Sequence, residues 1–194
     1  GTNPICIAIP SNLKGPIFVD MATSAVAGGK IILAAARGTS IPEGWLLDSK
    51  GNPTTDPNDR ATGAQLPLGG TEGHKGYGLS VMVEILSGVL TGLGFGVEPS
   101  GRHNDGCFMA VFDVSKFRPI DTFKQEVTEF ADYLKSSEPA TGFDEVFYPG
   151  ELEHLHSRRI AIEGISVENS TWSKLTKLAE DFGISDQLGL NQYQ

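Results

Sequence analysis

Short apolar runs alternate along the chain with longer stretches in which apolar residues recur at helical spacing. Two runs, 5–9 and 17–19, predict short buried strands separated by the turn-forming sequence PSNLKGP. Further strands are expected at 45–48, at 107–112 and just after Gly142. Helices are expected at 21–38, 78–91, 122–136, from 149–151 onward and at 171–181. This alternation indicates an α/β or α+β fold with a mixed sheet and flanking helices.

One stretch, residues 66–91, combines a glycine-rich loop with a long apolar segment. The loop 69–73 leads to His74 and Lys75, and its glycines let the backbone approach a ligand closely. Apolar residues from Gly78 onward fall on a broad helical face, which predicts a largely buried helix. Unpaired amides, the positive end of the helix dipole and the Lys75 ammonium would favour an anionic group. The alternative is a glycine-rich turn before a core helix, with Lys75 in solvent.

Two further sets of polar residues lie beside predicted strands. Asp20 ends the strand at 17–19 and precedes a helix. Its carboxylate can bond a hydroxyl of a ribose or substrate, or it can cap the helix that follows. Arg102 and His103 precede the strand at 107–112, where an arginine or a histidine can hold a carboxylate. A solvated loop pair is the alternative for Arg102 and His103.

Composition and charge argue against several classes of function. The 194 residues carry 15 Lys and Arg against 24 Asp and Glu, and the net charge of −9 disfavours non-specific binding of nucleic acid. No apolar run is long enough to cross a bilayer, so no membrane partner is expected. Cys6 and Cys107 lie in apolar contexts, which predicts buried free thiols in a reducing, cytoplasmic environment. His154 and His156 lie two residues apart, on different faces of a helix, so no metal site is expected.

Residue chemistry alone does not identify a reaction. No GxSxG nucleophile motif occurs, and GLGFG at 92–96 lacks the spacing of a dinucleotide fingerprint. The chain begins at GTNP, directly before a strand and without an initiating Met, which predicts the middle of a longer protein. The residues therefore support an α/β ligand-binding fragment with an anion-binding loop at His74 and Lys75.

Five stretches of the chain together resemble one known family. They read GTNPICIAIP, VDMATSAVAGGKI, SIPEGWLLDSKGNPTTDP, LPLGGTEGHKGYGLSVMVEILSGVLTG and GFDEVFYPGE. In this order and spacing, residues 1–164 resemble the malate/L-lactate dehydrogenase family of NAD(P)-dependent 2-oxo-acid reductases, which includes sulfolactate and ureidoglycolate dehydrogenases. The resemblance implies a non-Rossmann, sulfolactate dehydrogenase-like fold, usually dimeric, that binds NAD(P)H without GxGxxG. Residues 165–194 are expected to form a C-terminal helix and tail.

The resemblance also implies roles for individual residues. The segments that contact the cofactor in this family match Asp20, Met21 and Ala22, then His74 and Lys75, then Gly150, Glu151 and Leu152. For Asp20 this favours cofactor contact over helix capping. Some members place an arginine just before the strand that matches 107–112. His103 holds that place here and Arg102 is adjacent, so either is expected to bind the substrate carboxylate.

The family's proposed general acid, a histidine, lies N-terminal to the GTNP segment, so no catalytic residue is expected among the four histidines of this chain. The implied reaction is hydride transfer between NAD(P)H and a 2-oxo or 2-hydroxy acid such as malate or lactate, within a homodimer. NAD is the expected cofactor, with NADP as the alternative. Two other hypotheses stay open: a dinucleotide-binding module without turnover of its own, and a phosphate-binding transferase that uses Gly69, Gly70 and Lys75.

Overall fold

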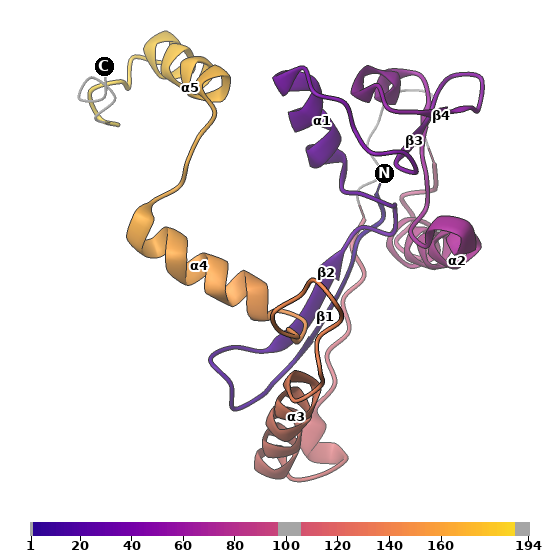
Figure 1. The fold of residues 1–194 in the computed structure, drawn as a ribbon, viewed down its shortest axis with the longest axis vertical. Coiled ribbons are helices and arrows are strands. Elements are labelled where there is room, and N and C mark those ends of the chain that lie inside the picture. The colour runs from indigo at the N-terminus through magenta and orange to yellow at the C-terminus, as the bar shows by residue number, and fades with distance from the viewer. Residues whose placement is uncertain (1, 97–105, 189–194) are drawn as a thin grey trace. The chain divides into compact units, whose positions relative to one another are not determined.

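The computed structural model describes residues 2–96 and 106–188 (Figure 1). The chain divides into two compact units, Gly1–Gly150 and Glu151–Gln194. The first contains β1 (Ile5–Ile9), β2 (Ile17–Met21), α1 (Gly28–Arg37), β3 (Leu46–Leu47), β4 (Pro53–Thr54), β5 (Ala64–Gln65), α2 (Gly73–Glu84) and α3 (Ile120–Lys135), and the second contains α4 (Glu151–Glu163) and α5 (Asn169–Asp181). The predicted division into a cofactor-binding part, 1–164, and a tail, 165–194, concerns function and stays a prediction.

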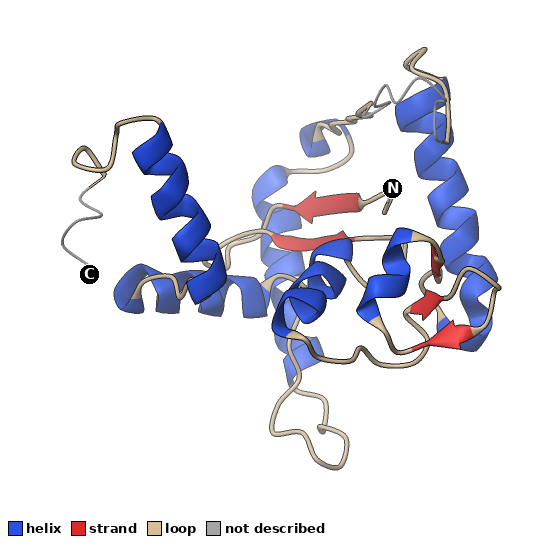
Figure 2. Cartoon of the chain, turned by 90° about the horizontal axis from the view of Figure 1, so that it is seen from above, coloured by secondary structure: helices blue, strands red, loops and turns tan. Residues whose placement is uncertain are grey.

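The two longest strands, β1 and β2, pair antiparallel, with Ile5 opposite Met21 and Ile9 opposite Ile17 (Figure 2). Both predicted strands are confirmed, and β2 continues two residues beyond the predicted end. The prediction that they are buried is wrong, because the three central residues of β1 are exposed. Cys6 is one of these three, and Cys107 is exposed as well, so the predicted burial of the two free thiols is also wrong.

The main apolar core of the first unit lies between α1 and the second sheet, which has the order β4-β3-β5 with antiparallel pairings. The core consists of Val26, Ile31, Ile41 and Leu46, with Ala34 and Trp45 packed against it. Ile31 and Leu46 are fully buried, and each contributes about 1.5–3 kcal/mol of hydrophobic stabilisation. The strand predicted at 45–48 is thus confirmed as β3, and helices combined with small sheets confirm the predicted fold class.

α1 begins at Gly28, seven residues later than the pattern predicts, so the predicted start of this helix is wrong. The amides of Thr23 and Ala25, which a helix would use internally, donate instead to carbonyl oxygens of distant residues, at 3.0 and 2.7 Å. These long-range bonds hold the segment after β2 in an extended turn. The helix ends as expected at Gly38, whose φ of 64° lets its amide bond the last turn.

α2 begins at Gly73, five residues before the predicted start, and continues as a π-helical turn, Ile85–Val89. Its apolar side chains are not buried: Met82 is 54% exposed and Leu90 is 63% exposed. The prediction of a largely buried helix is therefore wrong for the part of the chain that the structure describes. Apolar periodicity specifies which side of a helix can be covered, but it does not specify what covers it.

Two predicted strands, at 107–112 and after Gly142, do not form in the described residues. Residues 107–112 are exposed, and Val111 reaches 96% exposure. A strand needs a partner to bond its backbone, and none of the described segments supplies one here. The helix predicted at 122–136 is confirmed as α3.

The second unit consists of α4 and α5. α4 begins at Glu151, as the sequence predicts, and its first turn carries Glu151 and Glu153, where acids suit the positive end of the helix dipole. After α5, Gly183 adopts a φ of 65° and its amide bonds Glu180. Across residues 2–96 and 106–188, none of the helices combines the length and the apolar character that crossing a bilayer requires.

Candidate functional site

β2 and the residues directly after it carry the first of the predicted cofactor segments. Asp20 lies in β2 opposite Cys6, with its side chain exposed, and Met21 and Ala22 are half-buried. The alternative role of Asp20 as a helix cap is wrong, because α1 begins eight residues later with Ala27 at its N-cap. The Asp20 carboxylate makes no hydrogen bond or ion pair with another described residue, so it is available to a ligand.

The loop before α2, which leads to the second predicted segment at His74 and Lys75, is joined to the residues directly after β2. The amide of Leu68 donates to the carbonyl of Thr23 at 2.9 Å, and the amide of Ala25 donates to Leu66 at 2.7 Å. A further bridge pairs Ser24 with Pro67. This short antiparallel junction brings residues 66–68 beside residues 23–25, although more than 40 positions separate them in the sequence.

The glycine-rich loop forms a 3-10 turn, Gly70–Glu72, that leads straight into α2. The amide of Glu72 donates to the carbonyl of Gly69, and the amide of Gly73 donates to that of Gly70. The sequence predicted unpaired amides in this part of the chain, and for these two amides that prediction is wrong. Beyond the turn, the Glu72 carboxylate lies 3.6 Å from Lys75 Nζ and 3.7 Å from His74 Nε2.

Lys75 and His74 are each 70% exposed at the first turn of α2. An exposed ion pair of this kind contributes at most about 1 kcal/mol, so Lys75 can exchange Glu72 for another anion at little cost. The dipole of α2 adds to the attraction for a negative group at this end.

Gly76 fixes how closely the first turn of α2 approaches the loop. A Cβ built on Gly76 would lie 2.1 Å from the carbonyl oxygen of Leu68 and 2.6 Å from its amide nitrogen. Only a residue without a side chain permits this approach. The glycine next to Lys75 therefore places the lysine relative to residues 66–68, and through Thr23 relative to β2.

The third predicted segment meets β2 at the other end. The amide of Phe18 donates to the carbonyl of Pro149 at 3.2 Å. Gly150, with a φ of 93°, lies against the same residue, and a Cβ there would lie 2.7 Å from the Phe18 ring. Within the first unit, the residues directly after β2 thus bond the loop that precedes Lys75, while Phe18 in β2 contacts Gly150.

The placement of four predicted residues against this strand is not given by the structure. Glu151 and Leu152 begin α4 and belong to the second unit. Arg102 and His103, the predicted substrate residues, lie outside the described residues. The assignment of all ten site residues therefore stays a prediction.

A polar cluster on α2 was not anticipated from the sequence. Asn3 Nδ2 donates to the carbonyl of Ser80 at 3.0 Å and to Glu84 Oε2 at 2.9 Å. Glu84 Oε1 accepts the amide of Gly96 at 2.7 Å. Asn3 has a φ of 42°, a left-handed conformation that asparagine tolerates better than most residues. Its position between a threonine and a proline gives a hint of a turn, but no hint of its partner on α2.

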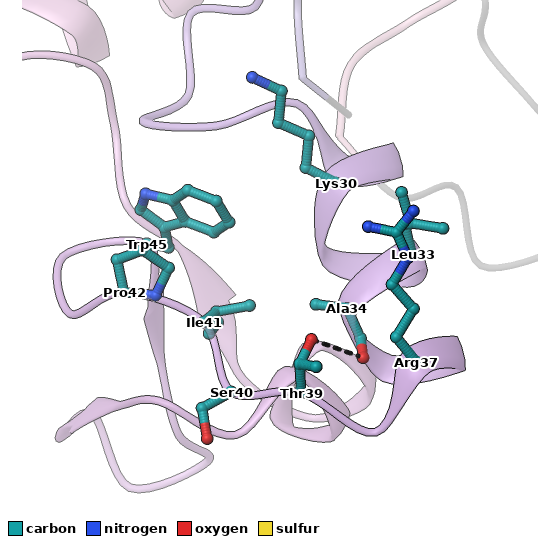
Figure 3. A pocket seen from close by; sticks show the side chains of 9 residues that line it. All are labelled: Lys30, Leu33, Ala34, Arg37, Thr39, Ser40, Ile41, Pro42 and Trp45. Carbon is teal, nitrogen blue, oxygen red and sulfur yellow. Dashed lines mark hydrogen bonds between the residues drawn. The ribbon is translucent and has the colours of Figure 1, made fainter.

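The first unit also contains a hollow of about 230 Å³ between α1 and residues 39–45 (Figure 3). Ile41 and Trp45 line one side, while Lys30 and Arg37 approach from α1. None of the predicted site residues that the structure describes lines it. The hollow lies beside the apolar core, and the predicted ligand chemistry lies along β2 and the start of α2.

Comparison with known proteins gives these contacts a family context. A malate/(S)-sulfolactate dehydrogenase of Methanothermus fervidus is 43% identical over 190 residues, which cover 95% of this chain and 53% of that protein. A ureidoglycolate dehydrogenase (NAD(+)) of Escherichia coli K12 is 36% identical over 201 residues, covering 100% of this chain and 54% of that protein. The chain thus spans about half the length of the relatives that it matches.

Solved structures with a similar fold include the same kinds of protein. The solved structure of sulfolactate dehydrogenase from Methanocaldococcus jannaschii matches with a TM-score of 0.71 and 34% identity, over 96% of this chain and 54% of that one. This confirms the predicted non-Rossmann fold of the sulfolactate dehydrogenase type. A family profile described as malate/L-lactate dehydrogenase matches residues 1–176. On these grounds the chain belongs to the malate/L-lactate dehydrogenase family.

Proposed function

We propose that β2, the loop before α2 and Gly150 form the dinucleotide-binding part of an NAD(P)-dependent 2-hydroxy-acid oxidoreductase. The observation that carries this proposal is the junction of Thr23 with Leu68, because it joins the residue directly after Asp20, Met21 and Ala22 to the loop that leads to His74 and Lys75. Phe18, in β2, bonds Pro149, next to the third segment. From Phe18 to Thr23 the extended chain spans about 16 Å, which is long enough for a dinucleotide to lie along it.

The side chains of these segments suit the chemistry of a dinucleotide. In this proposal the Asp20 carboxylate accepts hydrogen bonds from ribose hydroxyls, and Lys75 with the start of α2 binds a phosphate oxygen. A carboxylate accepts a free 2′-hydroxyl and repels a 2′-phosphate, so Asp20 favours NAD over NADP. Glu151 and Leu152 are proposed to contact the same cofactor.

The proposed reaction interconverts a 2-oxo acid and a 2-hydroxy acid, with malate and lactate as the model substrates. The bound nicotinamide supplies or accepts the hydride. Arg102 or His103 is proposed to hold the substrate carboxylate. The general acid is proposed to be a histidine in the part of the family's length that these 194 residues do not match, and the working protein is proposed to be a cytoplasmic homodimer.

A second candidate keeps the cofactor and omits the turnover. Because the chain spans about half the length of its relatives, it can contain the dinucleotide-binding residues without the catalytic acid. On this hypothesis the chain binds NADH but oxidises none of it, whichever 2-oxo acid is added. An assay of NADH absorbance with pyruvate, oxaloacetate and sulfopyruvate separates the two candidates.

The proposal is tested by titrating the chain with NADH and following nicotinamide fluorescence, with NADPH and ATP as competitors. Lys75→Ala is expected to weaken binding by about 1–3 kcal/mol, roughly 5- to 150-fold in Kd, because a charge-assisted bond is lost. His154→Ala, a change on α4, serves as the control and is expected to leave Kd unchanged.

Three results would contradict the proposal. Unchanged affinity in Lys75→Ala removes this lysine from the site, and a large loss in His154→Ala means that the site lies elsewhere. Displacement of NADH by low concentrations of ATP favours the phosphate-binding transferase over the oxidoreductase. Saturable NADH binding that only Lys75→Ala weakens supports the proposal.

A further inference from the structure

Thr23 is a buried polar residue at the point where β2 meets the loop before α2. Its side chain is 1% exposed. Its hydroxyl lies 3.1 Å from the carbonyl oxygen of Thr2 and 2.9 Å from that of Asn3, and its amide also donates to Thr2. Its own carbonyl accepts the amide of Leu68. One residue therefore bonds both the N-terminal segment and the loop that leads to Lys75.

Asn3 extends this connection to α2. Its backbone carbonyl accepts the Thr23 hydroxyl, while its side-chain amide donates to Ser80 and Glu84. Ser80 and Glu84 are four residues apart, so they lie on one face of the helix. The buried hydroxyl of Thr23, two residues after β2, is thus coupled through Asn3 to the middle and the end of α2.

The same helix is held a second time at its start, where Gly76 packs against Leu68. From Gly76 to Glu84 the helix axis runs about 12 Å, at 1.5 Å per residue. The contacts form a closed circuit: Thr23 to Asn3, Asn3 to α2, α2 to Leu68, and Leu68 back to Thr23. A helix held at two separated points along its length is more restrained against turning than a helix held at one.

We propose that Thr23 and Asn3 are positioning residues that set the orientation of α2 against β2, and thereby hold Lys75 in register with Asp20. This inference rests on the proposed function, because it assumes that these two side chains share a dinucleotide. The physical reason is that a small rotation of the helix displaces the side chains on its surface by a larger distance. Without the Asn3 anchor, a 20° turn of α2 about its axis moves a side chain at its surface by about 2 Å. Such a displacement breaks a hydrogen bond to a ligand that β2 holds in place.

The test compares Thr23→Val, which keeps the shape and removes the hydroxyl, with Thr23→Ser, which keeps the hydroxyl. In an NADH titration the valine variant is expected to raise Kd about tenfold, since a buried carbonyl loses its donor and the anchor loosens. The serine variant is expected to stay within about twofold of the original chain, because its donor remains. Thr176→Val, in which a hydroxyl that bonds only its own helix is lost, is the matched control.

Asn3→Gly provides an independent variant, because glycine accepts the left-handed backbone and the bonds of the Asn3 side-chain amide to Ser80 and Glu84 are lost. Its Kd for NADH is also expected to rise about tenfold, because the same anchor on α2 is lost. Circular dichroism checks that each variant is folded before it is titrated.

Amide hydrogen exchange supplies a measurement that needs no cofactor. In the ligand-free chain, Thr23→Val and Asn3→Gly are expected to exchange faster across 66–84 and at the original rate across α3. Unchanged exchange across 66–84 in both variants overturns the inference, as does original NADH affinity in a folded Thr23→Val. If the original chain does not bind NADH, the proposed function fails for this chain, and hydrogen exchange alone decides whether Thr23 and Asn3 position α2.

Discussion

Replacing Gly76 with alanine tests whether the approach of α2 to the loop depends on one missing side chain. The added Cβ would lie 2.1 Å from the carbonyl oxygen of Leu68 and 2.8 Å from its carbonyl carbon. A normal contact between carbon and backbone oxygen needs at least about 3.3 Å. The helix start and residues 66–68 must therefore separate by about 1 Å. The neighbouring atoms belong to the backbone, so no side-chain rotation can relieve the overlap.

The size of the effect follows from a comparison within the same helix. Alanine in place of glycine stabilises a helix by about 1 kcal/mol. At Gly78, also in α2, a new Cβ would meet nothing within 4 Å, so Gly78→Ala is expected to show this gain in full. Gly76→Ala receives the same gain but also bears an overpacking penalty of about 1–3 kcal/mol. The helix propensity cancels in the difference between the variants. We expect Gly76→Ala to be less stable than Gly78→Ala by about 3 kcal/mol, the upper end of that penalty.

Urea denaturation of both variants, followed by circular dichroism, measures this difference as a shift in midpoint at constant slope. The Gly76→Ala variant is also expected to bind NADH more weakly, because the separation moves Lys75 away from β2. Equal stability of the two variants would show that α2 does not approach Leu68 as closely as the structure indicates. The proposed coupling between β2 and Lys75 would then lose its geometric basis.

Two further predictions concern Gly150 and Asp48. Gly150→Ala is expected to be about 1–3 kcal/mol less stable than Gly142→Ala in urea denaturation, because both glycines have a φ near 90° but only Gly150 packs against Phe18. Equal losses would exclude a role for the Phe18 contact. At Asp48, hydrogen bonds from the Asn52 backbone amide, the Asn52 side chain and neighbouring amides hold the pKa of the carboxyl below its usual value. A lowered pKa in the folded state stabilises the fold above the unfolded-state pKa, and this stabilisation disappears as the pH falls below about 4. Asp48→Asn should therefore reduce the loss of stability on acidification, and an unchanged acid-unfolding profile would refute this assignment.

Local patterns in the sequence predicted several elements well. The apolar run at 5–9, helical periodicity at 122–136 and a glycine at position 38 each act through neighbours in the chain. Their outcome therefore depends little on distant residues, and the structure places β1, α3 and the end of α1 where these patterns indicated. The family resemblance rests on residue identities and their order, so it also needed no knowledge of the tertiary contacts.

Burial and long-range pairing could not be predicted in the same way. The apolar runs that predict the strands at 5–9 and 17–19 do not show whether another layer covers them, and Cys6 is exposed. The start of α1 was misplaced because Thr23 and Ala25 bond residues 2 and 66 rather than a helical turn. The tertiary hydrogen bonds of these amides override the local helix propensity, because an amide that donates to a distant carbonyl is not available for the helix.

The sequence by itself determined the residue types at the candidate site: the carboxylate at Asp20, the cation at Lys75 and the glycines at 76 and 150. Tertiary structure alone decided which distant segments meet β2 and the residues directly after it. The deciding contacts join positions 45 residues apart, in the bond from Leu68 to Thr23, and 131 apart, in the bond from Phe18 to Pro149. Each of these bonds forms only when the ends of a long intervening loop come together. Local propensities do not predict which ends meet, because the free energy for closing the loop comes from all the contacts that form together.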